Sequence, residues 1–305
     1  MAAETRDDAL PEFLARVASP ECVDWCAARI GADPEIVAEK IRQYSGEVPV
    51  ALSLLDGIPL EGRRILDVGA GIGLATFYLH RQGLDVTALE PGGIGFAINE
   101  TLFLALREFL DCAEVVLLQI GAEELDSKKH GQFDIMFSAN VLEHVADLDA
   151  VISAMAATLA PGGVMAHTCA NYTVPYEPHY RLMLLPFAPA ATPWAGKRKT
   201  EELWHSLNFI TARGVGRLMR EAGLSPSFAP GVMARSFERL LEDPVFAGRH
   251  DGWLMTVARL LKATGGIALL RAWPASLATP MEFRATKDRS ATPRQIAKRT
   301  GAGVS

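Results

Sequence analysis

One stretch of the chain decides the fold: Ile65-Leu66-Asp67-Val68-Gly69-Ala70-Gly71-Ile72-Gly73. Its first four residues predict a buried strand, its glycines predict a tight turn, and Leu74, Phe77 and Tyr78 predict a helix that follows. A strand, a glycine-rich turn and a helix let a nucleotide-like ligand approach the backbone at the helix N-terminus. Glycine suits such a turn because a Cβ would collide with the ligand or disfavour a positive φ.

The glycine spacing distinguishes between two classes of cofactor. A dinucleotide fingerprint runs Gly-x-Gly-x-x-Gly, whereas here the third glycine, Gly73, comes one residue early and position 74 is leucine. Asp67, at the strand end, would repel a pyrophosphate but suits a ligand with an amino group. The stretch resembles the first motif of class I S-adenosylmethionine-dependent methyltransferases. In that family the loop cradles the methionine part of the cofactor, so the resemblance implies S-adenosylmethionine as the cofactor.

A second acid follows the next predicted strand. Glu90 comes directly after Asp85–Leu89 and seventeen residues after Gly73. In open parallel sheets, ligands bind beyond the carboxyl ends of the strands, so Glu90 is expected to face the cofactor. A carboxylate there can accept hydrogen bonds from both ribose hydroxyls. The alternative interpretation is a surface acid at a strand end.

Two further segments extend the resemblance over residues 60–170. The family usually has a small and an acidic residue where Gly121–Leu125 lies, which implies that Ala122 and Glu123, or Glu124 instead, meet the adenine. The run Phe133–Val145, followed by Leu159–Gly163, resembles the fourth and fifth motifs of the small-molecule branch. The implied cofactor-binding residues are Asp67, Gly69, Ala70, Gly71, Gly73, Glu90, Pro91, Ala122, Glu123 and Asn140.

The composition limits the possible partners. The chain has 305 residues, of which 49% are hydrophobic, so it can bury one large core with an appended helical part. A net charge of −6 argues against binding to DNA and makes RNA an unfavoured partner. The N-terminus is polar and acidic and no apolar span of about 18 residues occurs, so we expect a cytoplasmic protein without a transmembrane segment. No metal is predicted, because the cysteines lack paired metal-ligand spacing: Cys22, Cys26, Cys112 and Cys169.

Strand and helix patterns alternate from Gly62 onward, which indicates an α/β fold with a parallel sheet covered on both faces. Together with the resemblance, this predicts a Rossmann-like, seven-stranded, mostly parallel sheet. The predicted organisation is a helical cap over 1–60, a methyltransferase domain over 61–287 with a helical insertion at about 234–275, and a flexible tail over 288–305. The predicted strands are Arg64–Val68, Asp85–Leu89, Glu114–Gln119, Phe133–Phe137, Gly163–Thr168, Pro226–Val232 and Met281–Thr286. The cap contains two predicted helix starts, at Ser19-Pro20 and Asp33-Pro34.

A long connection after the fifth strand predicts a substrate lid over residues 171–200. Its polar and aromatic residues suit the rim of an acceptor pocket, although they could instead pack on the sheet end. His179 in the lid, or His144 after the fourth strand, is a candidate general base, because imidazole titrates near neutral pH. The sequence leaves the choice between them open. The candidate acceptor-binding residues are Asn171, Tyr172, Tyr176, Glu177 and Tyr180.

The apolar run Leu182–Trp194 has three interpretations: a lid over a hydrophobic acceptor, a segment that touches a membrane surface, or ordinary core. Its prolines argue against a helix lying in a membrane interface and favour the lid.

The absence of certain motifs limits which kind of acceptor atom can be methylated. The residues Ser138-Ala139-Asn140-Val141 replace the Asn-Pro-Pro-Tyr type motif of enzymes that methylate amide or exocyclic nitrogen, and no Pro-Cys pair follows this strand. Methylation of oxygen or carbon remains, on a small metabolite, glycan or lipid-like acceptor, and oxygen is favoured because one histidine base would suffice. The alternatives are an RNA-modifying methyltransferase, a non-catalytic cofactor-binding regulatory module and, least favoured, a nicotinamide-dependent oxidoreductase. The oligomeric state is left open.

Overall fold

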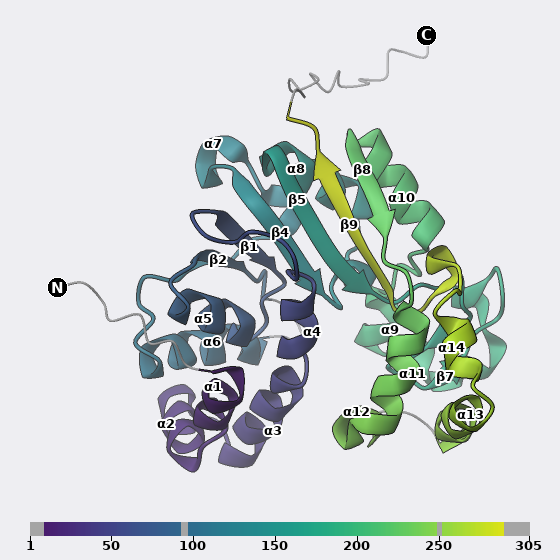
Figure 1. Ribbon diagram of the computed structural model, residues 1–305. Helices are drawn as coiled ribbons and strands as arrows, with labels where there is room; N and C mark the ends of the chain where they lie inside the picture. The colour runs from purple at the N-terminus through teal and green to yellow at the C-terminus, as the bar shows by residue number, and fades with distance from the viewer. Residues whose placement is uncertain (1–8, 93–96, 249–251, 290–305) are drawn as a thin grey trace, which may run out of the picture.

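A computed structural model describes residues 9–92, 97–248 and 252–289. Its centre is the predicted seven-stranded sheet (Figure 1). All strands run parallel except β9, which is antiparallel to both of its neighbours. In spatial order the strands are β3 (Val116–Leu118), β2 (Asp85–Leu89), β1 (Arg64–Val68), β4 (Phe133–Ala139), β5 (Leu159–Cys169), β9 (Met281–Lys287) and β8 (Leu224–Phe228).

Five strands differ in extent from their predicted bounds. β4 continues two residues further, to Ala139, and β9 one residue further, to Lys287. β3 is shorter than Glu114–Gln119. β5 begins at Leu159, so the Pro161-Gly162-Gly163 segment lies inside the strand, where the pairing with β4 shifts register. β8 ends at Phe228 rather than continuing to Val232, because Gly231 takes a positive φ and caps the next helix.

Side chains of the central strands alternate between two cores, as the two-residue period of a strand requires. Ile65, Ile135 and Phe137 face one core, whereas Leu66 and Met136 face the other. The first core is closed by α5 (Leu74–Arg81), α6 (Ala97–Phe109) and the N-terminal helices. The second is closed by α8 (Leu148–Thr158), α10 (Ala212–Glu221) and part of the lid. Helices therefore cover both faces of the sheet, as predicted.

Four helices precede the sheet: α1 (Leu10–Val17), α2 (Pro20–Ile30), α3 (Pro34–Ser45) and α4 (Val48–Ser53). The two predicted helix starts are confirmed. The side chain of Ser19 accepts a hydrogen bond from the backbone N–H of Cys22 at 3.3 Å, and that of Asp33 accepts one from Glu35 at 2.8 Å. Such caps satisfy backbone donors that have no partner within the helix. The helices pack on α6, with the rings of Trp25 and Phe109 5.7 Å apart.

The lid contains little regular structure. A small hairpin of β6 (Tyr176–Glu177) and β7 (Leu182–Met183) is followed by 3-10 turns at Pro189–Ala191 and Pro193–Thr200 and by α9 (Glu202–Ser206). The short elements η1 (Ala122–Glu124), α7 (Ser127–His130), η2 (Leu142–His144) and η5 (Ala275–Leu277) complete the fold.

The helical insertion lies between β8 and β9. It consists of α11 (Val232–Glu242), α12 (Pro244–Gly248), α13 (Gly252–Ala263) and α14 (Gly266–Leu270). Figure 1 shows these helices beside the lid, across a gap from α1–α3. None of the helices within 9–92, 97–248 and 252–289 is long and apolar enough to cross a membrane. The predicted flexible tail falls almost entirely on 290–305, outside the described residues, and the predicted domain limits stay a prediction.

Candidate functional site

A cavity of about 1660 Å³ lies beyond the carboxyl ends of β1, β2 and β4. The N-terminal helices, the lid and the helical insertion supply its other walls. This is where a doubly wound sheet places its ligand, because the turns that follow neighbouring parallel strands meet at one edge. The predicted site residues that line the cavity are Asp67, Gly69, Ala70, Gly71, Glu90, Pro91, Ala122, Glu123, Asn140, His144, Tyr176 and His179.

The glycine turn is held between two side chains. The backbone N–H of Gly71 donates a hydrogen bond to Oε2 of Glu90 at 2.8 Å. Gly71 has a φ of 57°, and a Cβ added to it would overlap the ring of Tyr44, which comes from α3. Gly69 and Gly71 thus have a positive φ and no Cβ, which lets the turn lie directly against Val141 and Tyr44. Gly73 does not line the cavity: it caps α5, and a Cβ there would overlap Phe103 in the core.

The two acids at the strand ends are buried within the cavity wall. Burial raises the pKa of Asp67 to about 7, and a 2.7 Å hydrogen bond from the hydroxyl of Thr76 offsets this only in part. Burial also raises the pKa of Glu90, against the lowering effect of the hydrogen bonds from Gly71 and Asn99. Both carboxyls carry a desolvation cost that a cationic ligand beside them would relieve. The pair therefore suits the positively charged end of an amino-acid-like ligand.

The turn after β3 separates the two candidate glutamates. Oε1 of Glu124 accepts a hydrogen bond from the backbone N–H of Gly121 at 3.1 Å, so Glu124 closes its own turn. Glu123 instead lines the cavity together with Ala122. Of the two acids that the sequence left open, only Glu123 is positioned to meet a ligand.

The N-terminal helices supply cavity residues that the sequence did not predict. The hydroxyl of Tyr44 accepts a 2.7 Å hydrogen bond from Asn99, and its ring lies against Gly71. Oε2 of Glu47 accepts a 2.9 Å hydrogen bond from the amide of Asn140, whose φ of 57° turns the chain at the end of β4. No spacing in the sequence connects these residues to the glycine turn, because the contacts form only when the cap folds back over the sheet.

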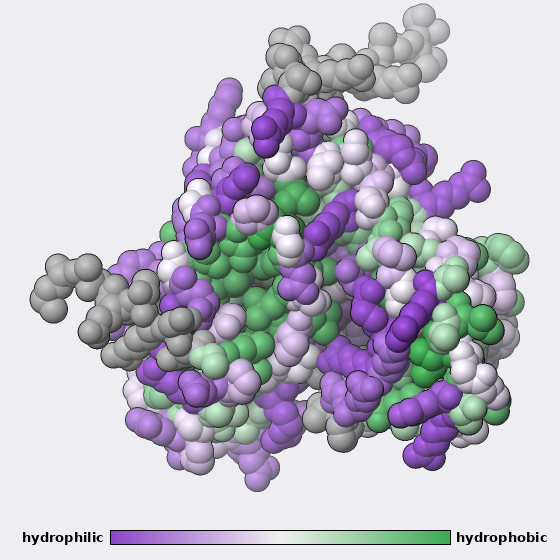
Figure 2. All heavy atoms as spheres, in the orientation of Figure 1, coloured by the Kyte–Doolittle hydropathy of each residue, from purple (hydrophilic) through white to green (hydrophobic). Residues whose placement is uncertain are grey.

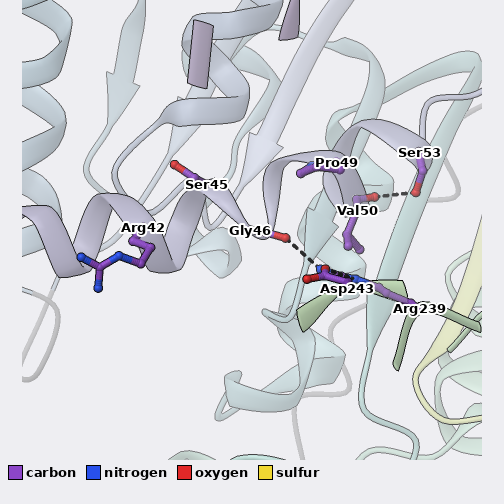
Figure 3. A pocket seen from close by; sticks show the side chains of 8 residues that line it. All are labelled: Arg42, Ser45, Gly46, Pro49, Val50, Ser53, Arg239 and Asp243. Carbon is purple, nitrogen blue, oxygen red and sulfur yellow. Dashed lines mark hydrogen bonds and ion pairs between the residues drawn. The ribbon is translucent and has the colours of Figure 1, made fainter. Parts of the chain in front are cut away.

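A bridge made by Arg239 joins the N-terminal helices to the insertion (Figure 3). Its guanidinium donates to the backbone oxygen of Gly46 at 3.1 Å and to Asp243 at 3.2 Å. Arg239 lines both the main cavity and a smaller one of about 520 Å³ between α3, α4 and α11. The wall of the main cavity at Arg239 is therefore tied to residues far away in the sequence.

The two candidate histidines lie together in the cavity wall, with ring centroids 5.2 Å apart. Nδ1 of His179 is 2.7 Å from Oε1 of the buried Glu177. Nδ1 of His144 is 2.9 Å from the hydroxyl of Ser206, which itself donates to the carbonyl of Leu203 at 2.8 Å. In this network each Nδ1 acts as a donor, so each Nε2 is left as the acceptor nitrogen.

The environments of the two rings shift their pKa values in opposite directions. Burial lowers the pKa of His144 to about 4, so this ring is neutral at physiological pH. Burial also lowers the pKa of His179, but the carboxylate of Glu177 outweighs it and leaves the pKa above its ordinary value. His179 is thus the stronger base of the two, and His144 suits a neutral orienting role.

Four candidate acceptor residues do not line the cavity. Asn171 is fully buried, and its side-chain amide donates to Ser276 and Ala278 at 2.9 Å each, so it ties the lid to the chain before β9. Tyr172 donates to Glu177 at 3.3 Å, and Glu177 supports His179 rather than facing the cavity. The ring of Tyr180 packs against Trp204. Tyr176 is the one acceptor candidate that the cavity includes.

Glu143 is a cavity residue that sequence reasoning missed. It is 1% exposed, and its Oε1 accepts a 3.3 Å hydrogen bond from the backbone N–H of Ala170. Its Oε2 has no hydrogen-bond partner among the described residues. Burial raises the pKa of Glu143 to about 7. The sequence position of Glu143, directly before His144, could have identified it. A turn that brings His144 to the cavity also brings Glu143 close to it.

The far end of the cavity is mostly apolar, and its charged lining residues include Arg235 and Glu282, which pair at 2.7 Å. Helices α11, α13 and α14 turn one face inward there, and Met183 closes the lid side. The inward residues are Val232, Met233, Phe237, Leu240, Trp253, Leu254, Val257, Leu261, Leu270 and Trp273. This chamber, at the opposite end from the glycine turn, suits a hydrocarbon group.

Comparisons with known proteins are consistent with this geometry. A family model described as a methyltransferase domain matches residues 38–226, well over half of the chain. The uncharacterised protein Rv1509 of Mycobacterium tuberculosis is 32% identical over 236 residues, which cover 74% of this chain and 79% of that protein. A ubiquinone biosynthesis O-methyltransferase of Bordetella avium is 31% identical over 57% of this chain and 66% of its own. Among solved structures, a phosphoethanolamine N-methyltransferase of Haemonchus contortus aligns with a TM-score of 0.49 and 16% identity, over 92% of this chain and 60% of its own.

Proposed function

The chain belongs to the methyltransferase-domain family, and from that premise we propose that it methylates the oxygen of an apolar small-molecule acceptor. Methyltransferases of this family use S-adenosylmethionine. Bound in the cavity, this cofactor supplies an electrophilic methyl group. The remaining requirements are to align the acceptor, to exclude water and to remove the hydroxyl proton.

The strand-end turns fit the cofactor. Asp67 offers a carboxylate to the amino group, Glu90 to the ribose hydroxyls, and Ala122 with Glu123 offers the turn for the adenine. Gly69 and Gly71 both have a positive φ and line the cavity, so their backbone faces the proposed ligand without a side chain. Three buried acids in one cavity (Asp67, Glu90 and Glu143) favour a ligand with positive charge, such as a sulfonium.

The proposal that oxygen is the methylated atom rests on the His179–Glu177 pair. A hydroxyl is a weak nucleophile until its proton is taken, and a histidine supported by a carboxylate is a general base for that step. In the proposed reaction Nε2 of His179 accepts the hydroxyl proton, while Glu177 stabilises the imidazolium that results. His144, neutral beside it, orients the acceptor through its own Nε2.

The apolar chamber of α11, α13 and α14 supports an acceptor with a hydrocarbon part. Each CH₂ group of an acceptor that is buried there contributes about 0.8 kcal/mol, so a chamber of this kind favours a hydrophobic group strongly. The relatives named for ubiquinone biosynthesis O-methylation support the same assignment.

Two experiments test the proposal in order. Calorimetric titration with S-adenosylhomocysteine, with NADH as a control, is expected to show micromolar binding of the first alone. Methyl transfer from a radiolabelled donor is then measured on acceptor pairs that share a hydrocarbon tail and differ in carrying a hydroxyl or an amino group. Faster labelling of the hydroxyl member is expected; preference for the amino member would assign nitrogen instead. Cofactor binding without labelling of any acceptor would favour the non-catalytic regulatory module.

The base is tested by the pH profile. In Glu177→Gln the pKa of His179 should fall, so the rising limb of the rate moves to lower pH and the maximal rate drops. Glu202→Gln, an exposed acid on α9, is the matched control and should leave the profile unchanged. An unshifted profile in Glu177→Gln would remove this pair from the mechanism.

A further inference from the structure

Large apolar side chains are exposed together around one end of the molecule. On the insertion they are Trp253, Leu260, Leu269 and Trp273, and on the lid they are Met183, Phe187 and Trp194. Leu269 is 77% exposed, and the ring of Phe187 is fully exposed. Figure 2 shows apolar surface over the region of α13 and α14, bordered by polar residues. We call these seven residues the docking surface; patches of this kind mark interaction sites.

The lid and insertion parts of the docking surface are held together by direct contacts. The rings of Tyr176 and Trp253 lie 6.3 Å apart in an edge-to-face arrangement. The guanidinium of Arg181 donates to the carbonyl of Gly248 at 2.9 Å. Within the lid, the indole of Trp194 donates to the carbonyl of Met183 at 2.5 Å. The lid hairpin is therefore fixed against the start of α13.

The two chain segments that form the docking surface are rich in basic residues. Acids lie next to them: Arg271 is paired with Glu238 of α11 at 3.0 Å, and Glu201 directly follows the lid segment. Residues 181–200 contain four basic residues and residues 252–281 contain three, and neither segment contains Asp or Glu. This concentration stands out in a chain with a net charge of −6. The residues are Arg181, Lys197, Arg198, Lys199, Arg259, Lys262 and Arg271.

The docking surface is continuous with the cavity. Met183, Trp253 and Trp273 line the cavity, and each is also about half exposed. The same side chains thus form the inner wall and the outer rim, so the apolar chamber opens where the exposed apolar residues gather.

We propose that the docking surface binds an anionic lipid bilayer and that the acceptor enters the cavity from it; only this second clause rests on the proposed function. Three of the five tryptophans of the chain lie on this surface, and tryptophan favours the membrane–water boundary. Short amphipathic helices with basic residues lie in that boundary, and each Lys or Arg near an anionic membrane contributes about 1 kcal/mol. A second copy of the chain fits less well, because a two-fold interface would set the same basic residues against each other.

Vesicle flotation tests the proposal without any need for turnover. The full chain is expected to float with vesicles of phosphatidylcholine mixed with phosphatidylglycerol, to bind phosphatidylcholine alone far more weakly, and to lose binding as salt is raised. Arg259→Gln combined with Lys262→Gln should lower the partition coefficient by about 25-fold, at roughly fivefold per charge. Leu269→Glu should abolish most of the binding.

Matched variants lie elsewhere on the molecule. Val116→Glu on the edge strand β3 replaces an exposed apolar residue, and Lys129→Gln on α7 removes a basic one. Both are expected to float like the unaltered chain, and circular dichroism checks that every variant is folded. Failure to bind anionic vesicles, or equal losses in the control variants, would overturn the proposal. So would a dimer in sedimentation that Leu269→Glu dissociates, since the surface would then join two copies. If vesicle binding holds while no acceptor is methylated, the proposed function fails and the docking surface stands.

Discussion

The two halves of the cavity are built in different ways. The half that we propose binds the cofactor (the cofactor half) is formed by short turns that follow β1, β2 and β3, and it is lined by backbone atoms and the carboxyls of Asp67, Glu90 and Glu123. The half that we propose binds the acceptor (the acceptor half) is formed by the lid and the helical insertion, with mostly apolar side chains and two histidines. The sheet fixes the first half, whereas loops and helices added to the sheet form the second. A substitution in the cofactor half should therefore change the affinity for the cofactor, and one in the acceptor half should change the rate of methyl transfer. Each substitution should leave the other property intact.

The largest expected effect separates chemistry from cofactor binding. His179→Ala should lower the rate of methyl transfer by about 10²–10⁴-fold, the usual contribution of a general base. The affinity for S-adenosylhomocysteine should stay unchanged, because His179 lies in the proposed acceptor half. Single-turnover kinetics beside calorimetry measures both. Unaltered turnover with a confirmed acceptor would make the histidine structural.

The reciprocal change is Glu90→Ala in the cofactor half. It should weaken binding of S-adenosylhomocysteine by about tenfold to a hundredfold, roughly 1.5–3 kcal/mol for a charged hydrogen-bonding group. Glu61→Ala, which removes an exposed acid that does not line the cavity, is the control. If Glu90→Ala binds as tightly as the unaltered chain, Glu90 has no part in holding the ribose.

A third substitution, Asp67→Asn, tests the cofactor half through the pH dependence of protein stability. The folded-state pKa of Asp67 is raised to about 7, from an ordinary value of 3.8, so between these values the folded chain binds more protons than the unfolded chain. This group therefore makes unfolding easier as pH rises, and its cost is largest above pH 7. Asp67→Asn should stabilise the unliganded protein by about 1–3 kcal/mol more at pH 8 than at pH 5, while weakening cofactor binding.

Denaturant unfolding of the unaltered chain and of Asp67→Asn at the two pH values measures this difference. The contributions of the histidines are the same in the two proteins and cancel. A gain that is equal at both pH values would show that Asp67 is not held protonated by burial.

The smallest expected effect concerns the Arg239 bridge, which joins the N-terminal helices to the helical insertion. Arg239→Gln removes hydrogen bonds to Gly46 and Asp243 and should cost about 1 kcal/mol of stability. Because Arg239 lines the cavity and ties two of its walls together, the cofactor should also dissociate faster. Stopped-flow release measures this; an unchanged rate would limit the bridge to a structural role. Arg217→Gln, in an exposed ion pair on α10, is the comparison variant.

The sequence predicts the cofactor half better than the acceptor half for a physical reason. Gly69, Gly71 and Glu90 lie in turns whose neighbours are close in the sequence or fixed by strand order, so spacing alone places them. Glu47 and Tyr44 reach the cavity by tertiary contacts that no local pattern encodes. Glu177 was predicted as a pocket residue because it is polar, yet its carboxylate is buried behind His179. A sequence does not distinguish a glutamate that supports a histidine from one that faces a ligand.

The place of β9 in the sheet has a consequence for the order in which the chain folds during synthesis. β9 lies between β5 and β8, although it is made after both. Until Met281–Lys287 leaves the ribosome, β8 has no strand to pair with, and β5 presents an open, apolar edge of the kind that promotes aggregation. This strand also carries Arg284, whose guanidinium donates to the carbonyls of Leu54 and Asp56, 230 and 228 residues earlier. A growing chain that already contains every proposed cofactor-binding residue therefore still lacks the strand that completes its sheet and ties the sheet to the N-terminal helices.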